Sequence, residues 1–164
     1  RQYMPAIEKG IKLAMNDGCF AGFPLSGVRV EVYDGKHHAV DSKEIAFVTA
    51  GKRAFIDAIL KAKPKLLEPY VKVEATGPQD RMGDMSGLLS GKRGRVTDTV
   101  MLAGNMCTVV AEVPMSELGS FSSELKSLTG GAGSYTLEYS HDEPAPPHVQ
   151  AEVVAAFEGH PVEA

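Results

Sequence analysis

Apolar and polar positions alternate with two different periods in the first third of the chain. A four-residue recurrence of isoleucine and methionine predicts a helix over residues 3–17. Valine alternating with charged residues predicts a half-buried strand over residues 28–34. A second helix is predicted over residues 44–62, after a capping Ser42 and before Pro64, and its small residues favour close approach to a sheet.

Two amphipathic helices need a larger sheet to cover than the strand at 28–34 supplies. We therefore expect that further strands of this domain precede residue 1 and that the sequence is a fragment. Some apolar helix surface, including Ile7, Ile11 and Phe47, should then stay exposed. A monomer is expected, with an artefactual dimer possible through the truncated domain.

The second half of the chain shows six periodic segments in the order strand, helix, strand, strand, helix, strand. This order predicts a ferredoxin-like βαββαβ domain, with one antiparallel sheet and both helices on one face. The second helix is predicted to open at Pro114 and to continue to Leu128. The predicted core includes Val73, Met85, Leu88, Val109, Leu125 and Leu137.

The predicted fold class is therefore α+β, with a truncated α/β domain at 1–67 and the ferredoxin-like domain at 68–145. Residues 146–164 form an acidic, proline-rich tail that we expect to be flexible, with at most one or two helical turns. Residues 1–68 carry eleven basic against eight acidic side chains, a net of +3, and the remainder carries a net of −7. Opposite signs suggest that the two halves meet different surroundings.

Several functional classes find no support in the residues. No apolar run reaches the length of a membrane helix, and no secretory signal is seen, so a cytoplasmic protein is expected. Cys19 and Cys107 have no metal-ligand spacing and are expected to be free thiols. No phosphate-binding loop or nucleophile elbow occurs. We predict no catalytic residue, no cofactor and no metal in this chain.

A polar turn after the predicted strand is the first candidate site. Neighbouring side chains in an extended loop point opposite ways, which disfavours a shared metal at His37 and His38 and favours contact with RNA or water. The loop residues in question are Gly35, Lys36, His37, His38 and Asp41. The densest positive cluster of the second half is Lys92, Arg93 and Arg95, which is either a solvated helix end or an RNA contact.

Five strings carry a family resemblance: YMPAIEKGIKLAM, YDGKHHAVDSKEIAF, LLEPYVKVE, RMGDMSGLLSGKRGRV and LKSLTGGAGSYTLEYSHDEP. From Arg1 to about Pro144 they resemble, in the same order, the C-terminal third of elongation factor G, the bacterial translocation GTPase. The resemblance implies a ribosomal-protein-like domain IV over the first half, with its first strands before residue 1. It implies domain V, which is ferredoxin-like, over the second half.

The resemblance also implies a mechanism and partners. Domain IV of the family is an arm that enters the decoding region as transfer RNA and messenger RNA advance, and His38 matches the histidine of its tip loop. Domain V of the family contacts large-subunit RNA, so the implied partners are ribosomal RNA and proteins. GTP and magnesium belong to an N-terminal domain that this sequence does not include.

Some positions depart from the family pattern and leave other functions open. Gly131-Ala132-Gly133 stands where members commonly carry an arginine between glycines, and Arg81 and Ser90-Gly91-Lys92 are also unusual. These departures favour a divergent paralogue, for which ribosome recycling or protection of the ribosome against tetracycline-type drugs are alternatives. A ferredoxin-like interaction module without a ribosomal role is a third alternative, because this fold serves many functions.

Overall fold

The structure is a computed structural model that describes residues 2–38 and 43–158. The chain divides into two compact units. The first comprises the chain up to Leu66 together with the segment that starts at Pro146, and the second comprises Leu67–Ala145. The segment predicted as a separate tail thus groups with the first unit.

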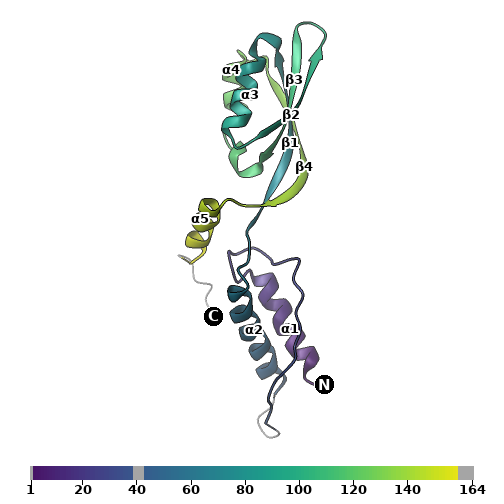
Figure 1. The fold of residues 1–164 in the computed structure, drawn as a ribbon, viewed down its shortest axis with the longest axis vertical. Helices are drawn as coiled ribbons and strands as arrows, with labels where there is room; N and C mark the ends of the chain where they lie inside the picture. Colours follow the sequence, from purple (N-terminus) through teal and green to yellow (C-terminus); the bar gives the residue numbers. More distant parts are fainter. Residues whose placement is uncertain (1, 39–42, 159–164) are drawn as a thin grey trace. The chain divides into compact units, whose positions relative to one another are not determined.

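The first unit contains helices α1 (Met4–Asp17), α2 (Glu44–Lys61) and α5 (Pro147–Glu158) (Figure 1). α1 ends as predicted at Gly18, whose φ of 74° lies in the left-handed region that glycine adopts without a steric penalty. α5 is longer than the one or two turns that the sequence predicts. Its Gln150 side chain accepts a hydrogen bond of 3.0 Å from the Leu66 backbone N–H, and its Phe157 ring lies against Gly22.

The helices α1 and α2 cross with their backbones in close contact. A Cβ at Gly10 would lie 2.0 Å from the carbonyl oxygen of Val48 in α2. A Cβ at Gly51 would lie 2.7 Å from the carbonyl oxygen of Ile7 in α1. Because such contacts are shorter than any carbon–oxygen pair tolerates, only glycine fits at either position.

The predicted strand at 28–34 is wrong. Residues 28–38 have no regular secondary structure, and Val30 and Val32 are 41% and 42% exposed. A strand needs a neighbour to pair its amides and carbonyls, and the described part of this unit contains only helices. The small residues of α2 also meet a helix where a sheet was predicted, since Gly51 faces α1 while Ala54 and Ala58 are exposed.

The core of the first unit is small. Partial burial of Ile7, Ile11 and Phe47 confirms that the helices keep apolar surface in contact with solvent. Its buried cluster consists of Ala14, Phe55 and Ile59, with Ile11, Met15, Cys19, Leu25, Val28 and Ile56 packed around it.

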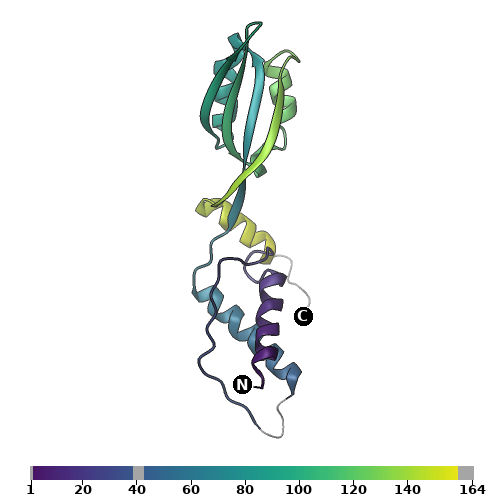
Figure 2. The same ribbon diagram turned by 90° about the vertical axis from the view of Figure 1, so that its right-hand side faces the viewer.

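The second unit is a four-stranded antiparallel sheet covered on one face by two helices (Figures 1 and 2). This arrangement confirms the predicted βαββαβ fold, with the strand order β2-β3-β1-β4. Val73 of β1 lies between Ala111 of β3 and Leu137 of β4. The elements are β1 (Leu67–Pro78), α3 (Met82–Gly91), β2 (Arg95–Leu102), β3 (Met106–Pro114), α4 (Phe121–Leu128) and β4 (Ser134–Pro144).

The second helix of this unit begins later than predicted. Pro114 is the last residue of β3, and a short 3-10 turn over Met115–Leu118 precedes α4. Gly119 and Ser120 separate the two, and both residue types have low helix propensity, which explains the interruption.

The core lies between the sheet and the two helices. Of the predicted core residues, Leu88 is half-buried against the core and Leu137 is 45% exposed, so that assignment was wrong for Leu137. β4 is an edge strand, and α4 reaches it at Tyr135, whose ring meets Phe121 edge-on at 5.0 Å. The buried set is Val71, Val73, Ala75, Met85, Leu89, Cys107, Val109, Ala111, Val113, Phe121 and Leu125.

Candidate nucleic-acid interface

The polar turn of the first unit begins at Asp34, whose Oδ1 accepts a hydrogen bond of 2.8 Å from the Gly35 N–H. Lys36 and His37, which follow in the chain, are exposed to solvent. His38 is also exposed. Asp41, the last of the predicted contact residues in this loop, lies outside the described residues.

Aromatic rings support the turn from the two helices. The ring of Tyr3, at the start of α1, stacks on Phe47 of α2 with centroids 4.0 Å apart and an interplanar angle of 11°. The His37 ring lies 5.9 Å from Tyr3 at an angle of 48°. An open hollow of about 340 Å³ separates these rings from the chain at 32–36.

The described part of this loop carries one basic side chain, Lys36. Lys36 forms no ion pair with any carboxylate among the described residues, although Asp34 lies two positions away. The two histidines belong to no metal-binding group, since the described ranges 2–38 and 43–158 contain no cluster of three or more potential ligands. The turn therefore offers hydrogen-bond donors and a cation to an anionic partner.

The cationic cluster of the second unit has a different environment. Lys92, at the end of α3, places its ammonium 3.1 Å from the Glu124 carboxylate of α4. The Ser120 hydroxyl and Lys92 both bond to Glu124, and together they lower the pKa of that carboxyl. The Lys92 side chain is only 12% exposed, so this cation ties α3 to α4.

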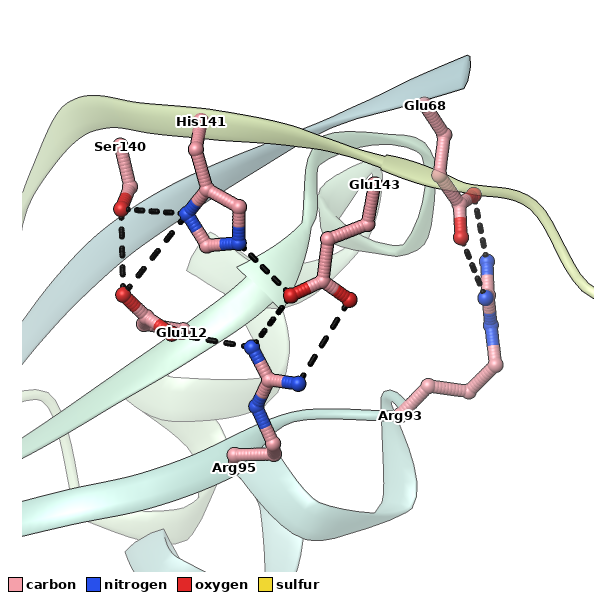
Figure 3. Close-up of polar contacts among 7 residues, drawn as sticks. All are labelled: Glu68, Arg93, Arg95, Glu112, Ser140, His141 and Glu143. Atoms are coloured by element: carbon pink, nitrogen blue, oxygen red, sulfur yellow. Dashed lines mark hydrogen bonds and ion pairs between the residues drawn. The ribbon is translucent and has the colours of Figure 1, made fainter. Parts of the chain in front are cut away.

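Arg93 joins three segments of the second unit, and Figure 3 shows its contact with Glu68 in one of them. Its guanidinium donates two hydrogen bonds, of 2.7 and 3.0 Å, to the carboxylate of Glu68 in β1. Its Nε donates a third, of 2.9 Å, to Glu117 in the turn after β3. The bonds to Glu68 are the main reason that the pKa of Arg93 is raised. The φ of 57° at Arg93 is unusual for a residue with a side chain, so this fork stabilises a strained turn between α3 and β2.

Arg95 is the centre of a second network (Figure 3). It donates hydrogen bonds of 2.6 Å to Glu143 and 3.1 Å to Glu112, across strands β4 and β3. The His141 Nε2 lies 2.7 Å from Glu143, and the His141 ring stacks on Tyr70 at 5.6 Å.

These contacts shift the acidity of both carboxyls. Hydrogen bonds from His141 and then Arg95 lower the pKa of Glu143. Bonds from Arg95 and then Ser140 lower the pKa of Glu112. The network thus favours the charged form of both acids.

Sequence reasoning placed the three cations of this cluster but missed their partners. Within the described residues, five carboxylates pair with Lys92, Arg93 and Arg95, so the cluster has no net positive charge. The partners lie 17 to 48 positions away along the chain, on strands, a 3-10 turn and a helix that only the tertiary fold brings together. The partner carboxylates are Glu68, Glu112, Glu117, Glu124 and Glu143.

The described helices include none that is long and apolar enough to cross a membrane.

Two family models match the chain: elongation factor G, domain IV, over residues 1–63, and elongation factor G C-terminus, over residues 65–153. The match to the C-terminus covers more than half of the chain, and the two matches meet where the first unit passes into the second.

Individual relatives agree with the family models. Elongation factor G of Petrotoga mobilis is 44% identical over 156 residues, which cover 94% of this chain and 22% of that protein. Elongation factor G 2 of Vibrio cholerae has the same identity and coverage. A crystal structure of a protein from Thermus thermophilus superposes with a TM-score of 0.79 at 41% identity, covering 97% of this chain and 24% of that chain. The chain spans about a fifth of the length of the curated relatives that it matches.

Proposed function

This chain belongs to the elongation factor G family, and we propose that it supplies ribosome-contacting surfaces of a translation elongation factor. Its two units correspond to domain IV and to the C-terminal domain of that family. The proposed partners are ribosomal RNA and proteins, and the proposed place of action is the cytoplasm.

The turn of the first unit is the proposed contact with RNA of the decoding region. The observation that carries this proposal is Lys36, an exposed cation that no carboxylate neutralises among the described residues. Its proposed targets are backbone phosphates and sugar hydroxyls, contacts that fix position without reading sequence. The proposed contact residues are Gly35, Lys36, His37, His38 and Asp41.

The role proposed for this contact is geometric. During GTP-dependent translocation, the arm binds better to the ribosomal state in which transfer RNA and messenger RNA have advanced. Differential affinity of this kind shifts a conformational equilibrium toward the bound state without any bond chemistry in the arm. Binding and hydrolysis of GTP, with its magnesium, are proposed to occur in a separate domain of the longer family proteins.

The second unit is proposed to contact the large subunit, with Lys92, Arg93 and Arg95 toward RNA. Arg95 is the best placed of the three, because its side chain is 56% exposed while those of Lys92 and Arg93 are 12% and 25% exposed. An RNA phosphate must compete there with carboxylates already in place. The turn of the first unit is therefore proposed as the stronger contact.

Co-sedimentation with ribosomes tests the proposal. The Lys36→Gln variant should bind less tightly than the wild type, and the difference should shrink as salt rises, because a phosphate contact releases counterions. Lys126→Gln, which removes an exposed lysine from α4, is the matched control and should bind like the wild type. Equal binding by both variants and the wild type would contradict the proposed contact.

A further inference from the structure

The chain passes between the two units twice, once at Leu66–Leu67 and once at Ala145–Pro146. β1 begins directly after the first crossing, and β4 ends just before the second. Because β1 and β4 are antiparallel neighbours in the sheet, both crossings leave the second unit at the same end of this strand pair. The stability of that end therefore sets how much chain is free to connect the units.

Backbone hydrogen bonding is limited at this end of the β1–β4 ladder. Pro69 of β1 and Pro144 of β4 both lie in terminal pairs, and a proline has no N–H to donate. The register then shifts between Tyr70 and Val71, so a bulge separates the terminal pairs from the regular ladder. A segment with so few backbone bonds can open locally while the rest of the sheet stays paired.

Two carboxylates oppose each other within this segment. Glu68 of β1 is the register partner of Glu143 of β4, and like charges directly opposite on neighbouring strands destabilise the pairing. The side chains of Glu68 and Glu143 are 8% and 28% exposed, so solvent screens their repulsion only in part. The pair favours separation of the two strand ends unless cations neutralise it.

One turn, between α3 and β2, supplies both cations (Figure 3). Arg93 donates two hydrogen bonds to Glu68, and Arg95, two positions later, donates one of 2.6 Å to Glu143. Arg95 also bonds to Glu112 of the interior strand β3, which ties the terminal segment to the middle of the sheet. The side chains of this turn thus supply the attraction that the terminal backbone pairs lack.

We infer that Arg93 and Arg95 act as a latch, which keeps residues 67–69 paired with residues 142–144. When the latch opens, these residues leave the sheet and join the two connections between the units. Each connection then gains three residues, which span about 10 Å when extended. The bulge limits the opening to this segment. The inference goes beyond the proposed ribosome contacts, because the latch lies within the second unit and needs no partner.

Amide hydrogen exchange followed by NMR tests the latch on the chain of residues 1–164. Arg95→Gln removes one of its two cations from a side chain that is 56% exposed, so the fold should persist. The amides of Glu68 and Glu143 should then exchange about two- to fivefold faster, the change expected for the loss of one partly exposed ion pair. The amide of Val73, beyond the bulge, reports opening of the whole unit in the same sample.

Two further variants separate the latch from a general loss of stability. Leu137→Ala, on β4 beyond the bulge, should speed exchange at Val73 and leave Glu68 and Glu143 unchanged. Combining Glu143→Gln with Arg95→Gln removes the repulsion together with the cation. This double variant should return the Glu68 amide to its wild-type rate.

Three results would overturn the latch. Unchanged exchange at Glu68 and Glu143 in Arg95→Gln would mean that the arginine does not hold this segment. Exchange there that follows Val73 in every variant would mean that the segment opens only when the whole unit unfolds. A double variant that exchanges as fast as Arg95→Gln would mean that no repulsion between the carboxylates is being countered.

Discussion

The two units use their charged and apolar residues in opposite ways. In the second unit the sheet and two helices enclose a continuous core, and the cations Lys92, Arg93 and Arg95 are bonded to carboxylates. In the first unit a few residues are enclosed, and Lys36 extends into solvent without an ion pair among the described residues. A cation held by its own fold stabilises the fold, while one left exposed is available to a partner.

The largest expected effect is on the closed core of the second unit. Leu125 is 1% exposed, and Leu125→Ala should lower the free energy of unfolding by about 2–5 kcal/mol, because it removes buried methyl groups and leaves a cavity. Leu137→Ala, at the exposed edge strand, should cost about 1 kcal/mol or less. Urea unfolding, with hydrogen exchange of β1 and β3 to locate the change, measures both. Equal costs would contradict the placement of the core.

Gly10→Ala should have the next largest effect, in the first unit. Its new Cβ would collide with the Val48 carbonyl, so α1 and α2 must separate at a cost of about 1–3 kcal/mol. Gly87→Ala in α3 is the matched control, since its Cβ meets nothing within 4 Å and should stabilise that helix by up to about 1 kcal/mol. Circular dichroism during urea unfolding measures the free energy of unfolding of both variants. An unchanged value for Gly10→Ala would mean that the two helices do not touch.

The Arg95 network should make the second unit sensitive to acid. The pKa values of Glu112 and Glu143 lie below their ordinary value of 4.5, so both stabilise the fold above that pH and lose the contribution as the pH falls through their lowered values. The urea midpoints of the wild type and Arg95→Gln should therefore differ at pH 7 and converge in acid. For Glu138→Gln, also on β4, the difference in urea midpoint from the wild type should not change in this way with pH.

The smallest effect on stability is expected at the exposed turn, and the largest on function. His38→Ala should change the free energy of unfolding by less than about 0.5 kcal/mol, because His38 is exposed. In a full-length family protein it should slow transfer RNA movement while GTP hydrolysis stays near normal. Rapid kinetics of the two steps measures this, and equal slowing of both would indicate a general binding defect.

The features that were predicted correctly from the sequence are those that depend on the spacing of apolar residues within one segment. The alternation of Val71, Val73 and Ala75 identified the buried face of β1, and helical spacing identified Met85 and Leu125. The βαββαβ order followed from these segments because each one finds its partner within the unit.

Features that depend on distant partners were missed. The alternation at 28–34 is typical of a strand, yet no neighbouring strand among the described residues pairs with it. Leu137 continues the alternation that buries Tyr135 against α4, yet on this edge strand it is 45% exposed. The carboxylates around Arg95 are placed by strand register and Glu117 beside Arg93 by the turn after β3, and the period of a single segment contains neither.

The glycine crossing of α1 and α2 has a mechanical consequence. At Gly10 and Gly51 the two helices touch backbone to backbone, with no compliant side chain between them. A load applied to the Phe47 end of α2 passes directly into α1, because closely packed backbones can neither shorten nor rotate aside. The crossing should therefore resist relative movement of the two helices. Larger residues there would separate the two backbones and weaken that resistance.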